Sequence, residues 1–113
     1  MDDELVASGR YVRIRTRGRL SGREREVTVG CAVDPGGPPG ALLVAAGAAE
    51  ADWAMNLLET PVCEVTIGDR TFDATAQPLS GAYHAAAIRA LILRYGTPAE
   101  GLGRGPSFRL VPI

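Results

Sequence analysis

Residues 11–30 have the sequence YVRIRTRGRLSGREREVTVG, which is the pattern of a β-hairpin closed by a basic turn. Before the turn, Val12 and Ile14 alternate with tyrosine and arginine, so the apolar side chains share one face. The alternation resumes after the turn and continues to residue 33. The sequence therefore predicts strands at 11–16 and 27–33 that pair antiparallel around the turn.

The rest of the chain contains short runs with strand spacing and two stretches with helical spacing. Further strands are expected at 41–46, 63–67, 71–77 and 107–113, and helices at 49–59 and 81–95. The Gly- and Pro-rich segments 34–40 and 96–106 are expected to be loops, and Pro112 places the last strand at a sheet edge. These elements predict a mainly β (α+β) fold, a six-stranded antiparallel sheet closed into a small barrel with two flanking helices.

The length and charge of the chain limit the classes of protein it can belong to. Its 113 residues are expected to form one domain, 1–113. The formal net charge of −1 argues against a general nucleic-acid-binding protein, although seven arginines lie within the first 25 residues. No apolar run reaches the ~20 residues of a membrane span, and the acidic N-terminus has no apolar signal region. We therefore expect a cytoplasmic protein.

The residues that most often carry catalysis form no recognisable pattern here. Cys31 and Cys63 lie in phase with apolar strand residues, which predicts buried free thiols. The single histidine, His84, has no matched cysteine, serine or carboxylate, so neither a metal site nor a catalytic triad is predicted. The chain is then either a binding module or a protein that positions a cofactor which carries the chemistry.

The basic turn, residues 18–25, is the first candidate site. Arg19, Arg23 and Arg25 offer forked, permanently charged donors beside glycines whose backbone N–H groups are accessible. This combination suits a phosphate or a carboxylate. The alternative is a solvated hairpin tip whose arginines keep a sheet edge soluble.

The helix predicted at 49–59 holds the second candidate site. Trp53 and Asn56, the only tryptophan and asparagine of the chain, lie one helical turn apart. An amide beside a large aromatic ring can hydrogen-bond a heterocycle and cover its face. The alternative is a core tryptophan next to a partly buried amide that is bonded to the backbone.

Two segments in this order resemble the deazaflavin-dependent nitroreductase family: TRGRLSGREREVTV at 16–29 and DWAMNLLETPVCEVTIGDRTFDATA at 52–76. The family shows a T-G-R-x-[ST]-G-x-x-R turn, which Ser21, Gly22 and Arg25 match best. It then shows W-x-x-N-L-x-x-x-P-x-V-x-V-x-[IV]-G, in which Cys63 replaces the first valine here. Many members carry a basic residue where this chain has Leu20.

The resemblance implies a split β-barrel of the flavin-reductase type and an oxidoreductase function. The hydride donor would be the reduced 8-hydroxy-5-deazaflavin coenzyme F-420, with FMN as the alternative, and the acceptor a small organic molecule. The implied cofactor-binding residues are Arg19, Ser21, Gly22, Arg23, Arg25, Trp53 and Asn56. A homodimer is also implied. The alternative function is that of a small-molecule-binding or biosynthetic accessory protein without redox activity.

Overall fold

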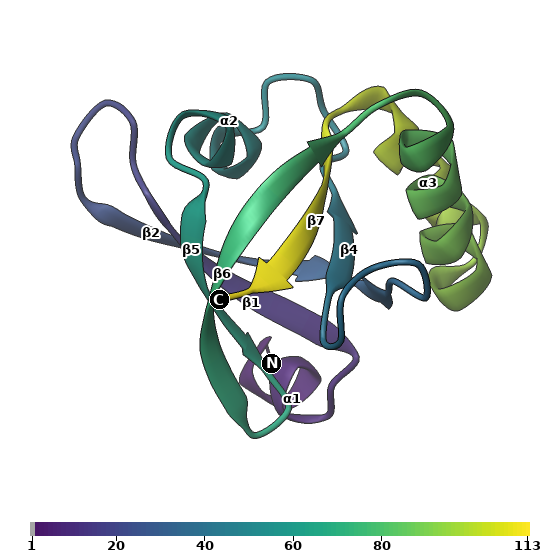
Figure 1. Ribbon diagram of the computed structural model, residues 1–113, viewed down its shortest axis with the longest axis horizontal. Coiled ribbons are helices and arrows are strands. Elements are labelled where there is room, and N and C mark those ends of the chain that lie inside the picture. The colour runs from purple at the N-terminus through teal and green to yellow at the C-terminus, as the bar shows by residue number, and fades with distance from the viewer. Residues whose placement is uncertain (1) are drawn as a thin grey trace.

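The computed structural model describes residues 2–113. It contains one sheet of seven antiparallel strands, rather than the six expected. The hairpin predicted near the N-terminal end forms the first two of these strands. The sheet curls into a half-barrel in the order β2-β1-β5-β6-β7-β4-β3 (Figure 1). The strands are β1 (Tyr11–Arg17), β2 (Glu24–Gly30), β3 (Ala32–Val33), β4 (Leu42–Ala45), β5 (Val62–Ile67), β6 (Arg70–Leu79) and β7 (Ser107–Pro112).

The additional strand arises because the segment predicted as one strand at 27–33 divides at Cys31. Residues before Cys31 pair with β1, whereas those after it pair with β4. The backbone N–H of Cys31 donates to the hydroxyl of Tyr95 at 2.9 Å instead of to a neighbouring strand. A side chain from a distant helix therefore satisfies the backbone at the point where the chain changes partner.

The core lies inside the curled sheet and follows the predicted alternation. Val12 and Ile14 of β1, Val65 of β5, and Phe108 and Leu110 of β7 are all fully buried. In β4, by contrast, every residue is buried, as its continuous apolar run predicts. Both cysteines are free and buried, which confirms that prediction.

The last strand, β7, does not lie at an edge, so that prediction was wrong. It pairs with β6 on one side and β4 on the other. Pro112 is tolerated because it lies past Leu110, the last β7 residue that pairs with β4. The edges of the sheet are β2 and β3.

Two of the helices, α2 (Asp52–Glu59) and α3 (Gly81–Tyr95), confirm the predicted ones. Two short helices were not predicted: α1 (Asp2–Ala7), and the 3₁₀ helix η1 (Thr97–Arg104), where a flexible loop was expected. The glycines of η1 hide its helical signal, but Ala99 and Leu102 pack with α3 and fix it. Within residues 2–113, no helix is both long and apolar enough to cross a membrane.

Figure 1 shows how these helices surround the sheet. Helix α3 covers one side of the half-barrel, beside β4, and α1 lies beside the lower part of the β5–β6 hairpin. Helix α2 lies at the other end, next to the β1–β2 hairpin, whose turn extends away from the sheet. This arrangement brings the basic turn and α2, the two candidate sites of the sequence, to the same end of the molecule.

Candidate functional site

A groove of about 510 Å³ opens between the basic turn and α2. We call it the turn–helix groove. Its lining residues are Thr16, Gly18, Arg19, Leu20, Ser21, Arg25, Glu26, Val27, Asp52, Trp53 and Asn56. The structure thus brings together five of the seven residues predicted to bind a cofactor, while Gly22 and Arg23 lie outside the lining.

The turn is shaped by its own backbone and by its glycines. The N–H of Gly18 donates to the carbonyl of Arg23 at 2.7 Å, and that of Gly22 to the carbonyl of Gly18 at 2.8 Å. Gly22 has φ +71°, a left-handed conformation that explains why glycine is needed there. Within residues 2–113, no hydrogen bond is found for the N–H groups of Leu20 and Ser21, two residues that line the groove.

Arg19 faces α2 and is held by it. Its backbone N–H and its guanidinium both donate to Oδ1 of Asn56, at 3.1 and 2.9 Å. The guanidinium also donates to the carbonyl and the carboxylate of Asp52, each at 3.3 Å. The Asn56 amide completes the network by donating to the hydroxyl of Thr16 at 3.4 Å. Of the two interpretations of Asn56, the structure shows a buried amide bonded within the protein, at the wall of the groove.

Arg25 differs from Arg19 although both line the groove. It is exposed, and within the described part of the chain its guanidinium has no ion pair or hydrogen bond. By contrast, Arg15 on the neighbouring strand is surrounded by acids, among them Glu26 at 2.7 Å and Glu64 at 3.4 Å. The hydrogen bond to Glu26 and the nearby carboxylates raise the pKa of Arg15, so it stays a cation whose charge is compensated by acids. Arg25 is therefore a cation at the groove that is free to meet a ligand.

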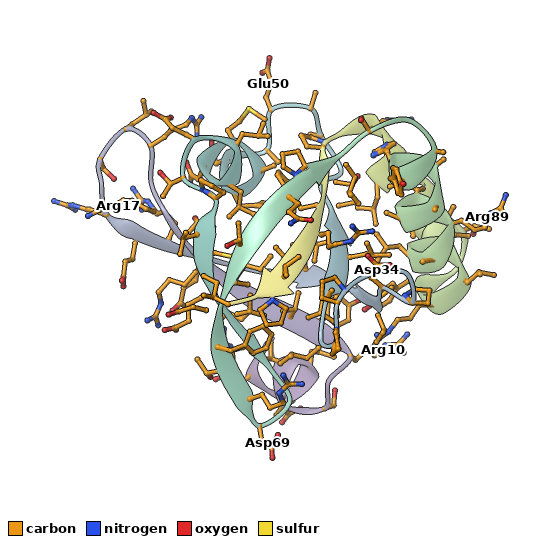
Figure 2. The ribbon with its side chains drawn as sticks, viewed as in Figure 1. Arg10, Arg17, Asp34, Glu50, Asp69 and Arg89 are labelled. Atoms are coloured by element: carbon orange, nitrogen blue, oxygen red, sulfur yellow. The ribbon has the colours of Figure 1, made fainter. Side chains whose placement is uncertain are left out.

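Arg17 and Arg23 belong to the outer surface of the hairpin. The side chain of Arg17 points away from the barrel (Figure 2), and its Nε donates to the carbonyl of Gly22 at 3.3 Å. Arg23 is exposed, and its backbone N–H donates to the hydroxyl of Ser21 at 3.2 Å. The solvated-tip interpretation therefore describes these two arginines.

Trp53 combines the two roles considered for it. The indole is half-buried and packs on the core, with its ring centroid 6.0 Å from that of Phe108 at a tilted 51°. The same residue lines the groove. Its apolar surface, together with Val27 and Leu20, gives the groove an apolar wall beside its cationic one.

Thr16, Glu26, Val27 and Asp52 also line the groove and were not predicted as site residues. Thr16 and Asp52 could have been found from sequence, since Thr16 lies two residues before the basic turn and Asp52 begins the helix that carries Trp53. The orientation of the Thr16 and Asp52 side chains could not have been predicted from the sequence.

No other catalytic group is assembled within the described residues. His84 is half-buried, and its Nδ1 lies 2.7 Å from the hydroxyl of Ser107, which is fully buried and has no access to a substrate. Burial raises the pKa of the Cys63 thiol to about 11, so the thiol is neutral and unreactive at neutral pH. Residues 2–113 hold no cluster of metal-ligating side chains.

Comparison with known proteins identifies one sequence family. The profile of the F420H(2)-dependent quinone reductase family matches residues 7–98. No curated protein sequence matches this chain.

The fold is shared with several solved structures. An F420-H2 dependent reductase, FDR-A, is 24% identical with a TM-score of 0.73, over 89% of this chain and 93% of that one. A structure described as a domain-swapped dimer is 20% identical with a TM-score of 0.72, over 96% and 92%. The heme storage protein HutZ from Vibrio cholerae is 21% identical with a TM-score of 0.75, over 98% and 87%. At these identities the structures establish the fold alone.

Proposed function

The chain belongs to the F420H(2)-dependent quinone reductase family, and from this premise we propose that the turn–helix groove holds the anionic end of coenzyme F-420. The protein is an oxidoreductase, and its cofactor is the reduced deazaflavin. When bound, the deazaflavin supplies the hydride, which accounts for a protein without a nucleophile or a metal cluster among its described residues.

The donor set of the groove fits an anion, and this observation carries the proposal. Within residues 2–113, no partner is found for the N–H groups of Leu20 and Ser21, and the Arg25 guanidinium forms no ion pair. Backbone N–H groups and a forked guanidinium together suit phosphate and carboxylate oxygens. We assign the anion contacts to these groups and to the hydroxyl of Ser21. Gly22 and Arg23 are left out because they do not line the groove.

The apolar wall of the groove suits the aromatic rings of the deazaflavin and of its electron acceptor. Trp53 and Val27 present apolar surface in the groove beside the cationic turn. A planar heterocycle would pack against the indole, which is fixed by its contact with Phe108. We propose a quinone as the electron acceptor, because the family description names one. The side chains on this wall exclude water and orient the deazaflavin ring and the quinone, whereas the basic turn holds the charged end of the coenzyme.

The decisive experiment is a titration of coenzyme F-420, followed by fluorescence, into the wild type and Arg25→Gln. A charge-assisted hydrogen bond contributes roughly 1.5–3 kcal/mol, so Arg25→Gln should weaken binding about ten- to a hundredfold. Arg89→Gln makes the same change of charge on the outer side of α3 (Figure 2) and should bind like the wild type.

The salt dependence and a second ligand make the test specific. The loss caused by Arg25→Gln should shrink as salt rises, because screening weakens the contact in the wild type. FMN is titrated in parallel. Equal binding of coenzyme F-420 by Arg25→Gln and the wild type at low salt, or tighter binding of FMN than of coenzyme F-420, would contradict the proposal.

Two further expectations remain proposals. A homodimer is supported by the similar structure described as a domain-swapped dimer and by the two open sheet edges, β2 and β3. The cytoplasm is the proposed location, as expected from the sequence.

A further inference from the structure

Arg19 and Arg25 lie on the same turn and line the same groove, but their charges have different surroundings. The guanidinium of Arg19 donates to the Asn56 amide and to two oxygens of Asp52. The side chain of Arg19 is only 26% exposed, and the Asp52 carboxylate compensates its charge at 3.3 Å. For Arg25 no such partner is found within the described residues.

From this contrast, and resting on the function proposed above, we propose that Arg19 and Asn56 are positioning residues. They hold the basic turn against α2 so that Arg25 and the N–H groups of Leu20 and Ser21 are arranged to bind the anion. In this assignment Arg19 does not contact the coenzyme.

The burial of Asn56 supports this assignment. Asn56 is 3% exposed, and its amide oxygen accepts two hydrogen bonds from Arg19. Its amide nitrogen donates to Thr16, which is 2% exposed. If the amide turned toward a ligand, it would leave a buried hydroxyl and a backbone N–H unpaired, which is costly. The hydrogen bonds of the Asn56 amide therefore connect α2 to Arg19 of the turn and to Thr16 of β1.

The position of the Arg19 backbone explains how this junction acts on the site. Its N–H is fixed on Asn56 at 3.1 Å, immediately before the two residues whose N–H groups lack partners. Within residues 2–113, every side-chain hydrogen bond between the turn and α2 involves Arg19, which donates to Asn56 twice and to Asp52 twice. Loss of either Arg19 or Asn56 should therefore loosen the same junction.

A double-mutant cycle tests this directly, with coenzyme F-420 as the titrated ligand. Arg19→Gln and Asn56→Ala should each weaken binding about tenfold. The affinity of the double variant should lie within about twofold of that of the weaker-binding single variant. Two independent ligand contacts would instead multiply to about a hundredfold loss, and that result would overturn the proposal.

The salt dependence separates positioning from charge contact. Because Asp52 compensates the charge of Arg19, the double variant Arg19→Gln/Asp52→Asn, which removes both charges, should keep the wild-type dependence of affinity on ionic strength, whereas Arg25→Gln should reduce it. A reduction as large for Arg19→Gln/Asp52→Asn as for Arg25→Gln would show that Arg19 contacts the anion. Arg19→Lys keeps the charge but not the fork, so it should bind as weakly as Arg19→Gln. If Arg19→Lys restores binding, the proposal is wrong.

A measurement without coenzyme separates this inference from the proposed function. Trp53, the only tryptophan, lies on α2 beside the turn. Its fluorescence should be quenched more readily by acrylamide in Arg19→Gln and in Arg19→Lys, and as in the wild type in Arg25→Gln. If Trp53 is unchanged in the Arg19 variants, the junction is not what holds the turn. If the quenching behaves as expected but Arg25→Gln binds coenzyme normally, the proposed function fails and the junction stands.

Discussion

Replacement of Tyr95 by phenylalanine should loosen the corner at which the sheet changes direction. The hydroxyl of Tyr95 accepts the N–H of Cys31 at 2.9 Å and donates toward the carbonyls of Cys31 and Arg10. It thereby connects the end of α3 to the junction between β2 and β3, and to the residue before β1. Within the described residues 2–113, no strand supplies these backbone groups with a partner.

The expected cost follows from the burial of Cys31, which is fully enclosed. Tyr95→Phe keeps the ring and its packing on Tyr11 but leaves a buried N–H unpaired. An unsatisfied buried donor costs about 1–3 kcal/mol of the free energy of unfolding. At roughly 4 °C per kcal/mol for a domain of this size, Tm should fall by about 4–12 °C.

Thermal unfolding followed by circular dichroism measures this change. Tyr11→Phe is the matched control, because the Tyr11 ring packs on that of Tyr95 at a tilted 49°, with 5.4 Å between the ring centroids, and no hydrogen bond of the Tyr11 hydroxyl is found within residues 2–113. Tyr11→Phe should change Tm by less than about 2 °C. If the two variants have the same Tm, the hydroxyl of Tyr95 does not stabilise the corner and the explanation for the divided strand is wrong.

Two further predictions concern the groove and the core. Leu20→Lys adds a cation to a turn residue that is 91% exposed, so it should strengthen binding of coenzyme F-420 about two- to fivefold at low salt and less at high salt, as measured by the same titration. Burial raises the pKa of the Cys63 thiol from 9.0 to about 11, so the unfolded thiol ionises first and the free energy of unfolding should fall as pH rises from 9 toward 11. Urea denaturation across this pH range should show a smaller fall in the free energy of unfolding for Cys63→Ala than for the wild type. An identical fall would exclude ionisation of Cys63 as a source of the pH dependence.

Much of the fold is predictable because local periodicity is strong in this chain. The alternation of Val12 and Ile14 and the continuous apolar run of β4 decide which faces are buried, and the structure confirms both. The division at Cys31 could not be predicted, since its cause is a tyrosine 64 residues away. The interior position of β7 was missed for a related reason. Pro112 excludes a ladder hydrogen bond at one residue, but only the register shows that β4 pairing ends before it.

The candidate site illustrates a different limit. Arg19, Arg23 and Arg25 are chemically identical and lie within seven residues, so no pattern distinguishes them. The structure does, because α2 supplies an amide and a carboxylate to Arg19 and none to the others. Composition therefore overstates the charge that a ligand would meet. Of the two arginines that line the groove, one is already compensated, so among residues 2–113 the anion would meet a single free guanidinium, two N–H groups and the Ser21 hydroxyl. With so little free charge, the position of Arg25 relative to the backbone donors becomes decisive, and that position depends on the junction between Arg19 and Asn56.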